Sequence, residues 1–288
     1  MSKSIKWGVL NGCLILILLG MTGKTVAQEL RIMSYNIRYD NPGDGPNSWP
    51  NRKDYLIRQV AHYAPDVVGT QEGLIHQLEE MDQGLEKYTF FGVGRDNGGK
   101  EGEYSAVFYR EDRLELVRQE TFWLSETPEK PSKGWDAALN RVCTYGLFRH
   151  RQTGQSFYVF NTHFDHIGEQ ARLESVNLII EKIKEFNREG VPSILTGDLN
   201  LEPESAPIKK LASTLEDTYT HAGDNVYGPV GTFNGFNCDA PQDRRIDYIF
   251  TSPGDFEVTG QTTLGEVTGS GFPSDHFPVM ADLKRKSQ

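Results

Sequence analysis

The sequence predicts a mixed α/β (α+β) fold in one large domain, with helices covering mixed β-sheets. Segments with the apolar pattern of strands are interspersed with segments of helical periodicity. Several strand segments follow one another through short turns, such as Gln152–Gln155, which is typical of hairpins. Beyond residue 27 no Gly/Ser/Pro-rich linker or internal repeat divides the sequence. Residues 28–288 are therefore long enough for a single domain with a full core.

The expected elements follow from the apolar spacing along the chain. Leu56 and Val60 recur at helical spacing before Pro65 ends that helix, and Ile179 and Ile183 belong to the clearest helical stripe. In chain order we expect a strand at 30–36, a helix at 52–63, a strand at 66–70, a helix through 75–81, strands at 88–93, 104–110, 114–124, 142–150 and 156–162, a helix through 176–186, a strand at 193–196, a helix at 204–211, and strands at 245–251 and 279–283.

The first 27 residues have the three parts of a secretory signal peptide. Lys3 and Lys6 precede an apolar run from Trp7 to Met21, and Thr25–Ala27 offers small residues for cleavage. The run is short for a bilayer-spanning helix, which needs about 20 residues. We expect residues 1–27 to be cleaved and the protein to be exported, periplasmic or extracellular, without a transmembrane segment in the mature chain. An uncleaved anchor is the alternative.

The charge of the expected mature chain is strongly acidic. The full sequence holds 30 Lys and Arg against 40 Asp and Glu, and residues 1–27 contain three of the lysines, so the mature chain has 27 − 40 = −13. A strongly acidic protein gains little from counterion release on a nucleic acid. This disfavours a long nucleic acid as substrate, although the acids also serve simply to keep an exported protein soluble.

Two cysteines remain in the mature chain, Cys143 and Cys238. An exported protein offers conditions in which they could pair, but two thiols so far apart in sequence prove no pairing, and we expect two buried free thiols rather than a disulfide.

Six short segments run from an apolar strand into polar side chains capable of chemistry. Strand ends are where sheet-containing folds commonly place ligands. Singly, such an acid is usually an ordinary loop residue or helix cap, but six segments carrying acids, amides and histidines indicate a shared site. The segments are Met33–Asn36, Val68–Glu72, Phe160–His163, Leu195–Asn200, Arg245–Asp247 and Pro273–His276.

The residue types in these segments favour a particular metal. Clusters of Asp, Glu and Asn oxygens suit Mg2+ or Mn2+. The sequence has neither the Cys-rich spacing of structural zinc sites, nor an HExxH helix, nor a GxSxG elbow. Carboxylates combined with two histidines suit acid–base chemistry on a metal-bound phosphate.

In order and spacing, these segments closely resemble the endonuclease/exonuclease/phosphatase superfamily over residues 29–284. The most specific strings are Gly197–Asn200 and Ser274–His276, together with Gln71-Glu72. The strings Asn161–His166 and Leu124–Pro128 resemble a bacterial, exported branch of that superfamily. The resemblance implies a four-layer α/β sandwich in which two mixed β-sheets pack face to face with helices outside.

The resemblance also implies a metal site that binds Mg2+ or Mn2+. Glu72 matches the family's metal-binding Glu, and Asn36 matches the Asn that helps to hold the metal shell. Asp275 is expected near the metal.

Five further residues match the family's catalytic positions. Asp198 would position or deprotonate the attacking water, and Asn200 would hydrogen-bond the phosphoryl oxygens. His276 would contact the phosphate as a proton carrier or cationic stabiliser, while Asp247 orients it. His163 matches the second active-site histidine, which could protonate the leaving oxygen.

Other residues are candidates for the substrate-binding wall, each with a plainer alternative. Arg141 would clamp a phosphate oxygen or form a surface ion pair. Trp135 and Phe233 would form an apolar wall or belong to the core. Asp165 and His166 would line the pocket or cap the helix that follows.

Together these features predict a metal-dependent hydrolase that cleaves a phosphoester, as a phosphodiesterase or phosphatase, by attack of an activated water. We expect a monomer whose substrate is small or linked to a glycan or lipid. The alternative within enzymes is a secreted Mg2+-dependent endonuclease or exonuclease acting on DNA or RNA. A binding protein that has lost catalysis, and a sugar hydrolase using two carboxylates, fit the site residues less well.

Overall fold

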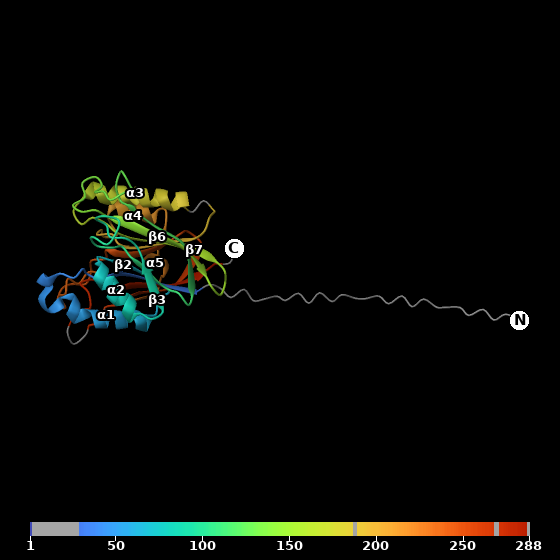
Figure 1. Ribbon diagram of the computed structural model, residues 1–288, viewed down its shortest axis with the longest axis horizontal. Coiled ribbons are helices and arrows are strands. Elements are labelled where there is room, and N and C mark those ends of the chain that lie inside the picture. The colour runs from blue at the N-terminus through green and yellow to red at the C-terminus, as the bar shows by residue number, and fades with distance from the viewer. Residues whose placement is uncertain (2–28, 187–188, 268–270, 287–288) are drawn as a thin grey trace.

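The computed structural model describes residue 1 and residues 29–186, 189–267 and 271–286. The predicted signal peptide and its cleavage site lie outside the described residues. Two mixed β-sheets of seven and six strands pack together, with helices on the outer faces (Figure 1). This arrangement confirms the predicted four-layer sandwich. In the described ranges, no helix has the length and apolar character needed to cross a membrane.

The seven-stranded sheet is covered by the first two helices, α1 (Trp49–Tyr63) and α2 (Ile75–Gly84), which follow a short 3-10 helix at Pro42–Asn47. Apolar residues of both helices, including Leu56 and Leu78, pack against the outer face of the sheet. The strands run in the order β10 (Val226–Tyr227), β12 (Phe256–Thr263), β13 (Val279–Arg285), β1 (Glu29–Asn36), β2 (Val67–Gln71), β4 (Val107–Arg110) and β3 (Tyr88–Phe91).

The six-stranded sheet is covered by α3 (Glu169–Phe186) and α4 (Ala206–Ala212), while α5 (Thr218–His221) packs beside β11 and β12. Ile179 and Ile183, the helical stripe expected from the sequence, are buried against this sheet. The strands run in the order β5 (Leu114–Trp123), β6 (Val142–His150), β7 (Ser156–His163), β8 (Ser193–Asp198), β11 (Asp247–Thr251) and β9 (Glu216–Asp217).

Between the sheets, an apolar core gives way to polar contacts near one end. The Asn161 side-chain amide donates to the carbonyls of Thr70 and Ala106 at 2.8 and 2.9 Å, and its Oδ1 accepts from Gln71 Nε2 at 2.7 Å. A Cβ on Gly69 would lie 2.2 Å from Thr196 Oγ1, so only glycine permits this approach of the sheets. The carboxyl ends of β1, β2, β7 and β8 are thereby held together.

Some expected elements differ from the structure. The strand expected at 104–110 begins at Val107, because Tyr104 instead forms an isolated bridge with Gly73. Strand β12 was missed, since its inward positions include the polar residue Gln261, which accepts a hydrogen bond from Thr218 Oγ1 at 2.8 Å. Polar residues at inward positions weaken the alternation on which a strand prediction depends.

Of the two cysteines in the described part of the chain, Cys143 is buried on β6 and Cys238 is exposed, and both are free. The pairing left open by the sequence is therefore absent from the structure.

Candidate active site

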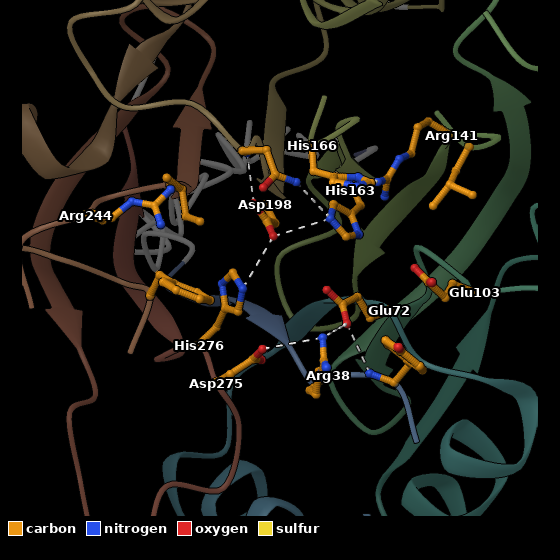
Figure 2. A pocket seen from close by; sticks show the side chains of 15 residues that line it. Arg38, Glu72, Glu103, Arg141, His163, His166, Asp198, Arg244, Asp275 and His276 are labelled. Atoms are coloured by element: carbon orange, nitrogen blue, oxygen red, sulfur yellow. Dashed lines mark hydrogen bonds and ion pairs between the residues drawn. The ribbon is translucent and has the colours of Figure 1, made fainter. Parts of the chain in front are cut away.

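A cavity of about 430 Å³ opens where the two sheets present their carboxyl strand ends (Figure 2). Asn36 and Asp247 are buried behind its wall and act on it through hydrogen bonds, whereas Trp135 is not one of its lining residues. The sequence-predicted residues that line the cavity are Glu72, Arg141, His163, His166, Asp198, Asn200, Phe233, Asp275 and His276.

Sheet topology explains why these residues meet. His163 and Asp198 are the last residues of the parallel neighbours β7 and β8, and they face each other in register. Asp247 is the first residue of β11, which runs antiparallel to β8 and pairs Asp247 with Asp198. His276 joins them through an isolated bridge with Phe233.

His276 lies between two buried carboxylates. Its Nδ1 is 2.9 Å from Asp247 Oδ2, and its Nε2 is 3.7 Å from Asp198 Oδ2. Burial opposes the charged imidazolium, but Asp247 and Asp198 outweigh it and raise the pKa of His276 well above its ordinary value. The geometry places Asp247 where an orienting carboxylate is expected, and it keeps a cationic ring at the cavity wall.

Asp198 is held by donors on both oxygens. Asn36 Nδ2 donates to its Oδ2 at 2.9 Å, and the Asn200 backbone N–H donates to its Oδ1 at 2.9 Å. Burial, and then the neighbouring Asp247 charge, raises the pKa of Asp198 to about 7. A carboxylate that titrates near neutral pH suits the task of accepting a proton from water.

His163 faces the same carboxylate from the other side. Its Nε2 lies 3.4 Å from Asp198 Oδ2 and 3.1 Å from Asn200 Nδ2. Burial, followed by the charges of Arg141 and Arg95, lowers the pKa of His163 well below its ordinary value. The ring is therefore neutral at pH 7 and suits a hydrogen bond to a substrate oxygen better than a cationic role.

Glu72 occupies a strained backbone position with φ of 67°, a conformation that is uncommon outside functional sites for such residues. Its Oε1 accepts from Asn36 Nδ2 at 3.0 Å, and its Oε2 accepts from the Tyr39 N–H at 3.2 Å. The Arg38 guanidinium lies beside it, with Nη1 3.8 Å from Glu72 Oε2 and 3.7 Å from Asp275 Oδ2 (Figure 2).

The donor set fits a hard divalent cation. Glu72, His163 and Asp198 each offer a ligand atom, and these atoms lie within 4.8 Å of one another. Carboxylate oxygens are the donors that Mg2+ and Mn2+ prefer. Within the described ranges Asp275 belongs to no such group, and the Arg38 guanidinium lies within 4.0 Å of both its carboxylate and that of Glu72. Its assignment as a metal residue stays a prediction.

Arg141 is buried rather than part of a surface ion pair. Its Nε donates to Asp165 Oδ2 at 3.3 Å, and its Nη2 lies 3.1 Å from His166 Nδ1. Asp165 also accepts from the N–H groups of Ile167 and Gly168 at 3.0 and 2.8 Å just before α3. Asp165 thus caps this turn and holds Arg141, while His166 lines the cavity.

The two aromatic candidates have separate positions. Phe233 packs edge-to-face on His276 with ring centroids 5.1 Å apart, and lines the cavity. Trp135 is half-buried on a loop, where its backbone N–H donates to the carboxylate of Glu126. The structure does not bring Trp135 to the cavity, so its predicted substrate contact has no geometric support.

Three charged residues of the cavity were missed by sequence reasoning, namely Arg38, Glu103 and Arg244. Arg38 follows Asn36 by two positions, and that proximity is a signal that could have found it. Glu103 lies in a loop with no motif of its own, so only the folded chain reveals it.

The chain belongs to the endonuclease/exonuclease/phosphatase family, whose model matches residues 33–276. Members of this family are phosphoester hydrolases.

Two similar solved structures come from Bacteroides thetaiotaomicron. One is an endonuclease/exonuclease/phosphatase family protein, with 40% identity, a TM-score of 0.88, and coverage of 91% of this chain and 100% of that one. The other is a mannosyl-6-phosphatase, with 42% identity, a TM-score of 0.85, and coverage of 88% and 99%.

Similarity to curated proteins is more distant. The Ccr4 3'-5'-exoribonuclease subunit of the CCR4-Not complex from Mycosarcoma maydis is 23% identical over 329 residues, which cover 87% of this chain and 49% of that protein. This chain spans about half the length of that relative.

Proposed function

We propose that the protein is a divalent-metal-dependent phosphatase that hydrolyses a phosphomonoester on a small molecule of the sugar phosphate class. The observation that carries this proposal is the convergence of His163, Asp198, Asn200 and His276 with Glu72 on one cavity of about 430 Å³. That volume is within the range of small-molecule sites. The similarity to a mannosyl-6-phosphatase, at 42% identity over 88% of this chain, supports a monoester on a sugar.

In this proposal Asp198 accepts a proton from a water molecule whose oxygen attacks phosphorus. The new P–O bond forms as the ester P–O bond breaks. The leaving oxygen takes up a proton from solvent, and Asp198 returns to solvent the proton that it accepted. Cationic His276 and the amide of Asn200 stabilise charge on the phosphoryl oxygens. Glu72 would hold a divalent cation, which when bound would supply Lewis-acid stabilisation of that charge.

The proposal also places the protein outside the cytoplasm. Lys3, Lys6 and the apolar run at 7–21 support export. N-terminal sequencing of the mature protein should begin near Gln28, and finding Met1 on cytoplasmic material would refute export.

The metal-dependent reaction is tested with a substrate panel in Mg2+ and in Mn2+: mannose 6-phosphate, p-nitrophenyl phosphate, bis-p-nitrophenyl phosphate and short RNA. We expect both monoesters to be hydrolysed faster than the diester or RNA. EDTA should abolish the activity and added metal should restore it. Full turnover in metal-free buffer would exclude the proposed mechanism, and a preference for RNA would favour the nuclease alternative.

The metal site is tested with Glu72→Gln, which keeps the side chain's size but removes its charge. Calorimetry should show weaker Mg2+ and Mn2+ binding in this variant. Glu115→Gln is the matched control, because Glu115 forms an ion pair with Arg149 on exposed β-sheet surface. Equal metal affinity in wild type and Glu72→Gln would show that the cation binds elsewhere.

A further inference from the structure

One wall of the cavity contains a carboxylate that the proposed reaction does not use. Glu103 lines the cavity, and its two oxygens accept from Arg95 Nη1 and Nη2 at 2.6 and 2.8 Å. The same two residues are joined by a backbone hydrogen bond from Arg95 N to Glu103 O at 3.1 Å. The carboxylate is therefore fixed in orientation by a fork of two donors, while burial raises the pKa of Glu103 to about 7 against the opposing charge of Arg95.

Backbone pairing explains why this carboxylate reaches the site. The Tyr104 N–H donates to the Gly73 carbonyl at 2.9 Å, which places the Glu103 segment beside the segment that carries Glu72. Figure 2 shows Glu103 at the side of the cavity away from His276, with Glu72 between them.

Arg141 approaches the same side of the cavity from the six-stranded sheet (Figure 2). Only 4% of this residue is exposed, and its Nη1 has no hydrogen-bond partner among the described residues. A buried guanidinium donor without an acceptor is costly. At the rim, His166 Nδ1 accepts a hydrogen bond from Arg141 Nη2, because a guanidinium can only donate. The hydrogen of the His166 ring is then on Nε2, which can donate to a ligand.

In the proposed reaction His276 and Asn200 contact the phosphoryl oxygens, so the phosphate lies at their side of the cavity. The Glu103 wall on the other side then faces the leaving group. Arg95 occupies one acceptor position on each Glu103 oxygen, and a carboxylate offers about four. The remaining positions could accept hydroxyl protons, while Arg141 and His166 have N–H groups that could donate to hydroxyl oxygens. Acceptors and donors side by side match neighbouring hydroxyl groups, each of which both donates and accepts.

We propose that Glu103, fixed by Arg95, forms with Arg141 and His166 a subsite that selects a leaving group with neighbouring hydroxyls. This proposal rests on the proposed phosphatase function and names the residues that determine its specificity.

The test compares kcat/KM for mannose 6-phosphate, whose leaving group carries hydroxyls, with kcat/KM for p-nitrophenyl phosphate, whose leaving group carries none. In Glu103→Gln we expect kcat/KM for mannose 6-phosphate to fall about tenfold or more, as for loss of a hydrogen bond to a charged group. Hydrolysis of p-nitrophenyl phosphate should stay near the wild-type value. Arg141→Lys should shift the same ratio in the same direction, and Glu115→Gln should leave it unchanged.

An equal loss on both substrates would show that Glu103 only supports the site, and would overturn the subsite. Wild-type hydrolysis of p-nitrophenyl phosphate without any preference for the sugar phosphate would overturn it too, while leaving the phosphatase function standing. Failure of both hydrolyses in Mg2+ and Mn2+ would instead reject the proposed function. Calorimetric binding of mannose 6-phosphate then decides the subsite: weaker binding in Glu103→Gln supports it, and equal or absent binding overturns it.

Discussion

Two buried acid–base pairs flank Ile246, and the contrast between them separates structure from function. In the first pair, Arg245 donates from Nη1 and Nη2 to the two oxygens of Asp217 at 3.2 and 2.8 Å. The guanidinium lies 4.6 Å from the ring centroids of both Tyr219 and Tyr248. Asp217 Oδ1 also accepts the Tyr219 N–H at 3.0 Å at the start of α5. Both terminal nitrogens of the guanidinium and both oxygens of the carboxylate therefore have protein partners.

The second pair, Asp247 and His276, is incompletely matched. Asp247 Oδ1 has no hydrogen-bond partner among the described residues, and His276 faces the cavity and a second carboxylate, Asp198. A buried ion pair alone therefore does not indicate a site here. Unmatched polar atoms beside a cavity, together with the strongly raised pKa of His276, do indicate one.

The largest expected effect concerns the second pair. His276→Ala, Asp247→Ala and the double variant should each lose kcat by a similar factor, on the scale of about 100- to 10,000-fold for acid–base groups. Residues that serve one step give non-additive losses. Thermal melts first confirm that each variant is folded. Steady-state kinetics then measure kcat. Losses that multiply cleanly would mean that Asp247 does not act through His276.

The first pair should show the opposite behaviour. Asp217→Asn should lower the free energy of unfolding by about 3–5 kcal/mol, because it leaves a buried guanidinium without its charge partner. Well below the variant's melting temperature, kcat should remain close to that of the wild type. Asp247→Asn should destabilise less, since it also relieves the repulsion between Asp247 and Asp198. Denaturant titration measures both, and a loss of kcat in Asp217→Asn as large as in His276→Ala would contradict the contrast.

A smaller effect concerns pH. Asp247 raises the pKa of His276, so the imidazolium persists into the alkaline range in the wild type. If the imidazolium of His276 stabilises the phosphoryl charge, kcat declines as pH rises through that pKa. Asp247→Asn removes the largest of the charges that raise this pKa, while Asp198 and Asp275 remain, so the alkaline limb of the residual kcat should move to lower pH. If the alkaline limb stays in place, the titration that causes it belongs to another group of the coupled cluster and not to His276.

Much of the fold and of the candidate site could be predicted from the sequence, because these features depend on residues that lie close together in the chain. Apolar spacing indicated the main helices and strands, and polar residues after strands indicated where Asn36, Glu72, Asp198 and His276 would gather. Asp198 and Asn200, which the sequence predicts to act side by side, do meet in the folded chain, where the Asn200 backbone N–H donates to Asp198 Oδ1. These features are local, so consecutive residues carry their signal.

Only the tertiary structure decided which charges share the cavity. Gly69 allows the sheets to approach, and the bridge of Tyr104 with Gly73 turns Glu103 toward the site. The same folding leaves Trp135 away from the cavity. Strand register and the approach of two sheets depend on contacts between residues far apart in the chain. Local sequence patterns carry no record of such distances, and for that reason the place of Glu103 in the wall proposed to face the leaving group emerged only from the fold.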